Sequence, residues 1–507
     1  MHKKHSKKIL IGLVVLIGLL AGSAVFILEP WLENKIRKAI AAADSGYLVE
    51  IVEINVSVFS FSVELDSISI RTREESDRES ELNLSIGFLK VKGIHAFKYL
   101  FKKEVEINEI KISRIAGNLN FSKDSAGKIV SPLNIHLRKV SVSSINLSFR
   151  DTSSSELYKV EEGALGFYDI DVVASDTLYP ALLGDFDFDF RRIYTITADS
   201  MYGIDIHGAV YSSGIHTLIV DSAFVNPSYP DYDFTSRKKY QTDRIEAEFR
   251  NFYMYDFSLA SFIDSANLVC SYVEIDRMKL EAFRDRRREF LHKDKPMLQD
   301  LLYNYQGKID IDSIILDNGD VTYREHASEA NHPGTITFNN LNAKIFTVCN
   351  DTLRKNEKLA LELKANALLM GKGKMNVIMT CPLFERSNSF SLSGNLESIN
   401  AMELNPMLER NAFLYVTSGD IQVMSFNFQA NRNRAEGGMT LLYQNLNLAV
   451  KNKDTDDTTA FKEKLFSVLA NTKSLNSNPL PGKEVRKGVI EFDRDPEKFL
   501  FHYCFKS

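Results

Sequence analysis

An apolar spacing that recurs along most of the chain constrains its fold more than any other feature. Two apolar residues alternate with polar ones, the phase slips by one position, and the alternation resumes. Alternation with a period of two is typical of β-strands. Seven stretches show the spacing: Val63/Leu65/Ile68/Ile70, Val105/Ile107/Ile110/Ile112, Val140/Val142/Ile145/Leu147, Leu165/Phe167/Ile170/Val172, Ile309/Ile311/Ile314/Leu316, Ile336/Phe338/Leu341/Ala343 and Leu441/Tyr443/Leu446/Leu448.

The residues at each slip are mostly polar, as in Asp66-Ser67, Ser143-Ser144 and Asn339-Asn340. A slip of one residue would normally move the later apolar side chains to the other face of the sheet. An extra residue at a bulge, or a bend, restores the facing and adds twist. We therefore expect strands that bend while one side stays apolar, although chance alternation is the competing explanation.

Other stretches alternate without a slip, including Asp185–Phe190, Leu359–Leu369 and Asp420–Gln429, which contains Phe426 and Phe428. One apolar and one polar side is the pattern of antiparallel sheets with one face in water. A mainly β fold is expected.

Composition excludes several functional classes. The 507 residues carry 62 basic and 67 acidic side chains, a net charge of -5, which argues against a general nucleic-acid binder. The four cysteines lie far apart without a C-x-x-C pair, which excludes zinc ribbons and thioredoxin-like sites. Buried thiols are expected, or one long-range disulfide in an oxidising compartment.

The amino terminus predicts a membrane anchor. Residues 9–28 are 20 uncharged, mostly apolar residues, enough for a helix across a hydrocarbon core of about 30 Å. The preceding tail, residues 1–8, contains Lys3, Lys4, Lys7 and Lys8, which favours a cytoplasmic tail and export of the remainder. Trp31 suits the membrane interface at the start of a juxtamembrane helix over residues 29–46.

A cleaved signal peptide is the alternative for this segment. Gly22-Ser23-Ala24 is a small-residue cleavage site, but the apolar run continues past it to Leu28. Both interpretations export the rest of the chain.

A helical segment over residues 276–306, interrupted at Pro296, is expected to separate an N-terminal β half (47–275) from a C-terminal one (307–507). Its basic cluster at 284–289 predicts either a site for lipid head groups or an acidic partner, or a solvated helix face. Shorter helices are expected at 93–101, 400–410 and 461–470.

The sequence contains no strong catalytic motif: no G-x-S-x-G, no H-E-x-x-H and no P-loop. His326 and His332 would need a third ligand to hold a metal. Asp185, Asp187 and Asp189 fit a wet strand face better than a calcium or acid/base site. We predict no enzyme activity and no metal or cofactor.

A single amino-terminal span followed by an exported body of bent, one-sided strands resembles the bacterial AsmA-like superfamily (AsmA/TamB-type envelope proteins), most clearly over residues 300–507. The segments that carry the resemblance are Lys308–Glu325, Pro333–Leu341, Phe390–Leu404 with Asn405-Pro406-Met407-Leu408, Thr417–Gln429, Gly437–Tyr443 with Leu446-Asn447-Leu448, and Arg486–Phe492 with Arg494-Asp495. They are low-information patterns rather than catalytic signatures.

The resemblance implies an elongated, curved, mostly antiparallel sheet that forms an open hydrophobic groove. It implies a protein of the bacterial inner membrane, with its bulk in the periplasm, that binds phospholipid acyl chains and supports lipid transport to, or homeostasis of, the outer membrane. Envelope proteins are possible partners. The groove candidates are Val63, Leu65, Ile68, Ile70, Val140, Val142, Ile145, Leu147, Ile309, Ile311, Ile314, Leu316, Ile336, Phe338, Leu341, Phe426, Phe428, Leu441 and Tyr443.

Two alternatives remain at the level of sequence. The same fold could act as an anchored scaffold for outer-membrane protein assembly without carrying lipid, using its outer surface near Arg286. An anchored hydrolase is the weakest alternative, since nothing in the sequence pairs a nucleophile with a base.

Overall fold

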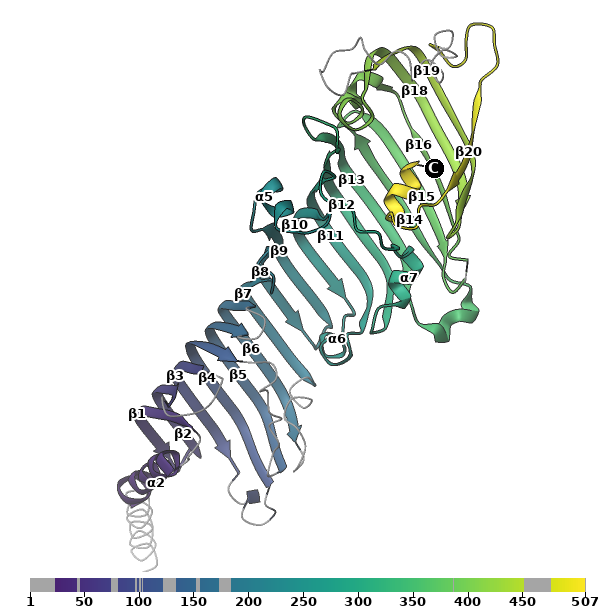
Figure 1. Cartoon of the computed structure of the whole chain (residues 1–507). Coiled ribbons are helices and arrows are strands. Elements are labelled where there is room, and N and C mark those ends of the chain that lie inside the picture. The colour runs from purple at the N-terminus through teal and green to yellow at the C-terminus, as the bar shows by residue number, and fades with distance from the viewer. Residues whose placement is uncertain are drawn as a thin grey trace, which may run out of the picture. The chain divides into compact units, whose positions relative to one another are not determined.

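The computed structural model describes residues 23–42, 46–73, 81–95, 98–99, 102, 104–121, 134–151, 156–172, 184–385, 387–450 and 476–506. These residues form an open, mostly antiparallel sheet of twenty strands with a few short helices (Figure 1). The mainly β fold predicted from the apolar spacing is therefore confirmed. Contacts divide the chain into two compact units, 1–200 with 206–215 (unit 1) and 201–205 with 216–507 (unit 2). The sequence placed its division later, at 276–306.

Unit 1 is a run of strands that pair with their neighbours in chain order, antiparallel except for the parallel pair β4–β5. A short π-helical turn, η1 (Ala24–Leu28), leads into helix α2 (Glu29–Ala42) ahead of the first strand. The strands are β1 (Tyr47–Ser57), β2 (Ser62–Thr72), β3 (Glu81–Ile94), β4 (Glu104–Phe121), β5 (Asn134–Asp151), β6 (Leu157–Val172) and β7 (Asp185–Ile196), and β8 (Tyr202–Ser212) has residues in both units.

In unit 2 the pairing again follows chain order, with β11–β12 parallel and β18 paired to both β16 and β17. The strands are β9 (Thr217–Pro227), β10 (Asp243–Tyr255), β11 (Leu268–Asp285), β12 (Ile309–His326), β13 (Gly334–Cys349), β14 (Ala360–Leu369), β15 (Gly373–Pro382), β16 (Phe390–Leu396), β17 (Ile399–Asn400), β18 (Leu414–Ala430), β19 (Arg434–Val450) and β20 (Lys487–Asp493). The helical elements are α5 (Asp231–Ser236), α6 (Leu259–Ser265), α7 (Leu298–Tyr303), η3 (Thr352–Glu357), η4 (Ala401–Leu404), α8 (Asn405–Met407), η5 (Leu408–Ala412) and α10 (Leu500–Lys506).

Residues in the left-handed backbone region interrupt the strands at five of the seven predicted slips. The second slip residue has a φ between 45° and 55° at Ser67, Ser144, Asp169, Asn340 and Asn445. At the other two slips the left-handed residue lies on the facing strand. Gly93 (φ 71°) faces Asn108, and Thr347 (φ 60°) faces Asp312. Left-handed residues therefore occur at all seven predicted slips, on the strand itself at five and on its neighbour at two.

An extra residue is not always needed for the bend. Ile51 faces Ile68 and Glu53 faces Asp66, so the register of β1 with β2 is unchanged across Val52 and Ser67. The pairs β5–β6, β12–β13, β13–β14 and β18–β19 do shift register at their irregular positions. A bulge is therefore one of two ways in which this sheet bends.

The expected helix over residues 276–306 is largely wrong. Residues 276–285 belong to β11 and pair with both β10 and β12, and the helix is limited to α7. The basic cluster is held by ion pairs rather than lying on a helix face. The Arg284 Nη2 lies 2.5 Å from Asp243, the Arg286 Nη1 3.1 Å from Glu325, and the Arg287 Nε 2.8 Å from Asp285.

Two of the other predicted helices are present in the structure. Residues 401–412 are helical in three short turns, as expected for 400–410, and α2 covers most of the expected juxtamembrane helix. Residues 93–94 end a strand, although 98–99 and 102 are helical. Residues 9–22 of the predicted span, with Lys3, Lys4, Lys7 and Lys8, and the expected helix at 461–470 lie outside the described residues. Within the described ranges, no helix combines the length and hydropathy that crossing a bilayer requires.

Candidate functional site

Strand register decides which side chains of this sheet share a face, because directly opposed residues on neighbouring strands project to the same side. In unit 1 the register aligns apolar residues in four rows that cross β1 to β7. Row A is Val56, Val63, Val91, Ile110, Val140, Phe167 and Phe186; row B is Ile54, Leu65, Leu89, Ile112, Val142, Leu165 and Phe188. Row C is Ile51, Ile68, Ile86, Ile115, Ile145, Gly163 and Phe190; row D is Val49, Ile70, Leu84, Gly117, Leu147, Val160 and Ile193.

The eight unit 1 groove candidates fall in these rows, two in each. They are Val63 and Val140 in row A, Leu65 and Val142 in row B, Ile68 and Ile145 in row C, and Ile70 and Leu147 in row D. The structure therefore aligns on shared rows residues that lie far apart in the sequence.

A line of irregular residues separates rows B and C. It crosses the strands at Val52, Ser67, Gly87, Arg114 and Ser144, of which Ser67, Arg114 and Ser144 are left-handed. Exposure shows that the apolar side is the same before and after the line. Ile54 is 4% exposed and Ile68 6%, whereas Val52 on the line is 76% exposed.

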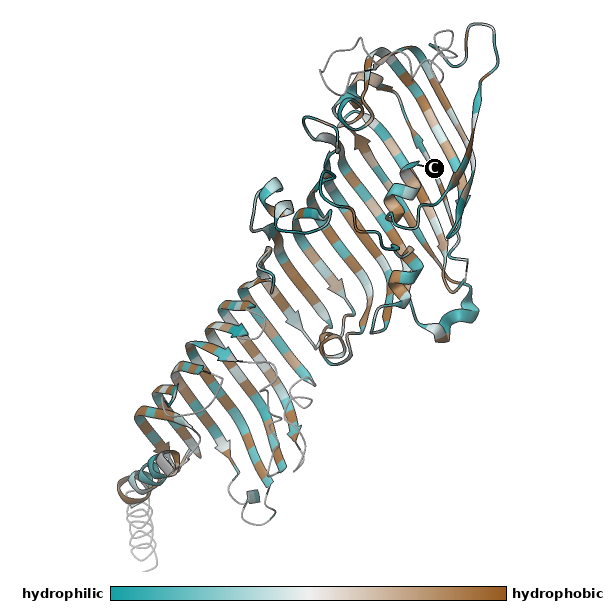
Figure 2. Cartoon of the chain, in the orientation of Figure 1, coloured by the Kyte–Doolittle hydropathy of each residue, from teal (hydrophilic) through white to brown (hydrophobic). Residues whose placement is uncertain are grey.

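Unit 2 repeats this design over more strands. Two central rows each cross β9 to β16 and β18 to β20, and polar and apolar residues alternate along these strands (Figure 2). Row E is Val220, Phe252, Ile275, Leu316, Ala343, Ala365, Val377, Gly394, Phe426, Met439 and Gly488. Row F is Leu218, Met254, Val273, Ile314, Ile345, Leu363, Met379, Leu392, Phe428, Gly437 and Ile490.

The unit 2 groove candidates divide between these rows and their flanks. Leu316 and Phe426 lie in row E, and Ile314 and Phe428 in row F. The others face apolar partners nearer the strand ends: Ile309 faces Leu268, Ile311 faces Cys270, Ile336 faces Tyr323, Phe338 faces Val321, Leu341 faces Gly319, Leu441 faces Met424 and Tyr443 faces Ile421.

One end of the apolar strip in unit 2 is covered by residues 399–412, the α8 segment. Leu404, Met407 and Leu408 of this segment pack against a buried cluster of Ile336, Leu369, Leu396, Ile399, Ala401, Val416 and Ile421. Asn405 fixes the segment to β18, since its side-chain amide donates to the Val416 carbonyl at 2.9 Å and accepts from the Val416 N–H at 2.8 Å.

The opposite strand ends are covered by residues 494–506, the C-terminal segment. The Tyr503 ring is 1% exposed and lies 6.0 Å from the Phe390 ring and 6.1 Å from the Phe492 ring. The Arg494 Nη2 donates to the Lys295 carbonyl at 2.6 Å, which ties this segment to the chain before α7. Burial raises the pKa of Tyr503 to about 12.

Two thiols belong to the same covered region. Burial raises the pKa of Cys381 to about 11 and that of Cys504 to about 12, so both stay protonated near neutral pH. All four cysteines are free thiols. Cys270, Cys349 and Cys381 are buried and Cys504 is half-buried, so the prediction of buried thiols is confirmed for three of the four. Rows E and F thus form an apolar strip with covering segments at both strand ends.

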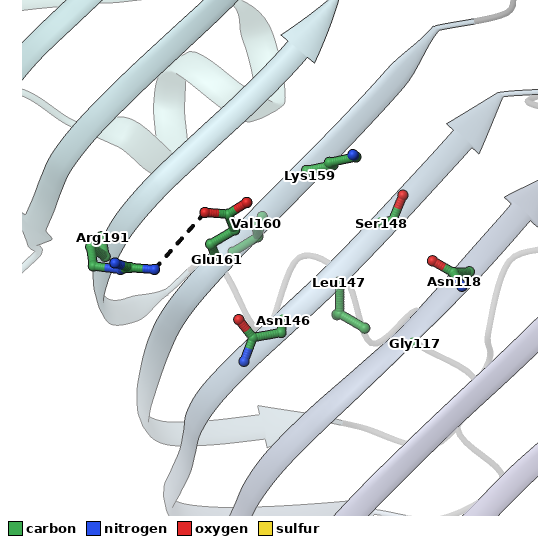
Figure 3. A pocket seen from close by; sticks show the side chains of 9 residues that line it. All are labelled: Gly117, Asn118, Asn146, Leu147, Ser148, Lys159, Val160, Glu161 and Arg191. Carbon is green, nitrogen blue, oxygen red and sulfur yellow. Dashed lines mark ion pairs between the residues drawn. The ribbon is translucent and has the colours of Figure 1, made fainter.

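A pocket in unit 1 is lined by both polar and apolar residues of the sheet. Its volume is about 400 Å³, and its polar lining includes Asn118, Ser148, Lys159, Glu161 and Arg191 (Figure 3). Its lining also includes Gly117, Leu147 and Val160 of row D. The Arg191 Nη2 lies 3.9 Å from the Glu161 carboxylate. This mixed-charge surface suits water rather than hydrocarbon.

The metal and acid/base candidates have structural partners instead. His326 is 3% exposed, its Nδ1 lies 2.8 Å from the Tyr232 hydroxyl and its Nε2 2.8 Å from the Ala330 carbonyl. The Ser213 N–H donates to the Asp187 carboxylate at 3.2 Å. Among the described residues, no group of three or more His, Cys, Asp or Glu side chains is placed to hold a metal ion.

Sequence reasoning missed many row members although the same spacing marks them. The unrecognised stretches are Val49/Ile51/Ile54/Val56, Leu84/Ile86/Leu89/Val91, Leu218/Val220/Ala223/Val225, Ala247/Phe249/Phe252/Met254 and Val273/Ile275/Met278/Leu280. Three of the five have polar residues at the slip, and accepting Val52 or Gly87 at the slip would have found the other two.

Comparison with known proteins does not identify the chain: no protein-family model matches it, and no curated protein matches it significantly.

Proposed function

We propose that the apolar strips of this protein bind the acyl chains of phospholipids, and that the protein carries lipid between membranes in the manner of AsmA-like proteins. The observation that carries the proposal is the alignment of apolar residues in rows E and F of unit 2, in which Gly394, Gly437 and Gly488 are the positions without a side chain.

The rows match an acyl chain in two respects, the apolar character of their surface and their length. Hydrocarbon chains are stabilised by apolar surface that removes them from water. Strands lie about 4.8 Å apart, so an eleven-residue row extends on the order of 50 Å. One leaflet of hydrocarbon is about 15 Å thick, so such a row exceeds the length of a single acyl chain. A lipid bound there would have room to move along the row.

The exposure of the rows also supports binding. In row F, Ile314, Ile345, Leu363 and Met379 are half-buried rather than buried, so they offer surface to a ligand. The covering segments at the strand ends would form the sides of the open groove that the resemblance implies. No bond is made or broken in this function, so it asks for no catalytic group.

The cellular setting follows from the amino terminus. Residues 9–28 would anchor the chain in the bacterial inner membrane, with Lys3, Lys4, Lys7 and Lys8 on the cytoplasmic side and the sheet in the periplasm. Phospholipid transport to the outer membrane, or control of its lipid content, is the role that this placement supports.

The test is site-specific photocrosslinking in the full-length protein. A photoreactive residue at Leu363 in row F should crosslink to co-purifying phospholipid, and one at Lys364, the adjacent position on the polar face, should not. Mass spectrometry of the extracted lipid gives a second measure, and the pair Leu363→Asp and Met379→Asp should lower it at least fivefold. Equal crosslinking at Leu363 and Lys364, or unchanged lipid in a folded double variant, would contradict lipid binding.

A further inference from the structure

The outer edge of β1 is occupied by side chains of α2. Within the described strands β1 pairs with β2 alone, and α2 lies beside it (Figure 1). The Glu29 carboxylate accepts a hydrogen bond from the Val58 N–H at 2.8 Å, and the Glu33 carboxylate accepts one from the Val56 N–H at 3.3 Å. The Arg37 Nη1 donates to the Ile51 carbonyl at 3.2 Å.

These three side chains replace a missing strand. They are spaced four residues apart, so they lie on one side of the helix. Carboxylates meet backbone N–H groups and a guanidinium meets a carbonyl, which are the partners that a neighbouring strand would supply. An edge strand without such partners is a template for pairing with another chain. We call Glu29, Glu33 and Arg37 the α2 cap.

The kink in β1 makes this edge symmetric. In an antiparallel ladder alternate residues point both backbone groups to the same neighbour. The outward residues are Val56 and Val58 after the kink at Val52-Glu53 but Ile51 before it, so the alternation changes phase there. By the same alternation Ile54 and Val49 also point outward.

A second β1 fits this edge in one antiparallel register. If Ile51 faces Ile54 of the other copy, then Val49 faces Val56. All four residues point their backbone N–H and C=O groups outward, so these groups of one copy meet those of the other. The same register places Glu50 opposite Asn55 and Val52 opposite Glu53, so no two carboxylates oppose each other. The arrangement is two-fold symmetric, as a self-complementary dimer contact requires.

We propose that the outer edge of β1 is a pairing surface for a second copy of this chain, and that the α2 cap occupies this edge and keeps the chain monomeric. Pairing would join the apolar rows of two copies, since row C of one copy would continue into row B of the other. This inference concerns assembly and does not depend on lipid binding.

Disulfide trapping in the full-length protein tests the register. Glu50→Cys and Asn55→Cys are introduced together, with and without Glu29→Ala, Glu33→Ala and Arg37→Ala. Residues 50 and 55 of one strand are about 16 Å apart, too far for a bond within the chain. After mild oxidation with copper phenanthroline, we expect at least fivefold more 50–55 linked dimer in the uncapped protein, identified by peptide mass spectrometry.

Two matched variants separate the cap from a general effect of altering α2. Glu29→Gln with Glu33→Gln keeps the hydrogen-bond acceptors and should stay monomeric. Asn34→Ala, Lys35→Ala and Lys38→Ala change neighbouring positions of the same helix and should also leave it monomeric. Glu53→Cys in place of Asn55→Cys is out of register and should give few dimers.

Hydrogen exchange in β2 to β4 establishes that the uncapped sheet is folded. A folded, uncapped protein that remains monomeric overturns the proposal, and so does equal crosslinking with and without the cap. If the triple variant does not fold, Glu33→Ala alone is used, with about twofold more dimer expected and no increase as the contradicting result.

Discussion

Units 1 and 2 use the same bent, one-sided strands but differ in what covers their apolar rows. In unit 2 the α8 segment and the C-terminal segment bury both strand ends, and Leu396, Val416 and Phe428 are each 2% exposed. In the described part of unit 1, Ile54, Ile68, Ile145, Gly163 and Phe186 are the buried members of rows A to D, and most others are half-buried. Bent strands therefore create an apolar strip, and added segments decide how much of it stays accessible.

The largest expected difference between the units is in the cost of truncating a row-side leucine. Leu396→Ala removes a side chain from the buried cluster under the α8 segment and should destabilise unit 2 by about 2–5 kcal/mol. Leu89→Ala in row B removes a half-buried side chain and should cost about 1 kcal/mol. Hydrogen exchange of amides in β16 and in β3 measures each effect separately. Equal losses would show that covering contributes little to stability.

The reactivity of cysteine thiols gives a second measure of how well the apolar rows of each unit are covered. At pH 8 a thiol with a pKa near 11, as for Cys381, is about 0.1% ionised, whereas an unperturbed thiol is about 25% ionised. Cys381 should therefore alkylate roughly 100-fold more slowly than a cysteine introduced by Val142→Cys in unit 1. Comparable rates, followed by mass spectrometry, would mean that the C-terminal segment does not stay closed.

The same thiols give a pH dependence with a defined sign. In the unfolded chain they ionise near pH 9, while in the folded chain Cys381 and Cys504 keep their protons to about pH 11 and 12. The unfolded state therefore binds fewer protons above pH 9, and unit 2 should lose stability as the pH rises from 9 towards 11. Cys381→Ser and Cys504→Ser together should flatten this loss in thermal unfolding.

Substitutions at the left-handed residues of the kinks are expected to change stability by similar amounts in both units. Ser67→Val and Asn340→Val place a β-branched residue at φ 54° and 52°, which should cost roughly 1–2 kcal/mol each. Ser67→Gly and Asn340→Gly should be nearly neutral because glycine adopts this conformation freely. Chemical denaturation compares the pairs. If Val and Gly were tolerated equally, the left-handed bends would not be structural requirements.

The smallest expected effect lies in unit 1, at a buried carboxylate. Glu106 is 4% exposed, and its hydrogen bond from Lys98, together with Arg138 at 3.3 Å, lowers its pKa below 4.5. Its stabilising effect is therefore present above pH 4.5 and lost as the pH falls through the lowered value. Glu106→Gln should reduce the melting temperature at pH 7 by about 2–4 °C and by less near pH 3. A constant difference would rule out this linkage.

The strands could be predicted because the apolar spacing that marks each strand lies within a short stretch of sequence. The pairing of charges and segments between distant strands could not be predicted in this way. The spacing of Val63, Leu65, Ile68 and Ile70 contains both the strand and its bend. The failure at 276–285 has a long-range cause. Arg284 is neutralised by Asp243 on a neighbouring strand, so a charged run that suggested a solvated helix is a strand whose charges pair across the sheet. The α8 and C-terminal coverings likewise depend on contacts between residues distant in sequence, such as Arg494 with Lys295.

Because nearly every strand of a unit contributes one side chain to each row, duplication of a β-hairpin would lengthen every row by two positions without disturbing its neighbours. The parallel pairs β4–β5 and β11–β12 mark places where the chain direction does not alternate, so a sheet of this kind is not limited to whole hairpins. Evolution could thus adjust the reach of the apolar surface in steps of one strand spacing, while the chemistry of each step stays the same.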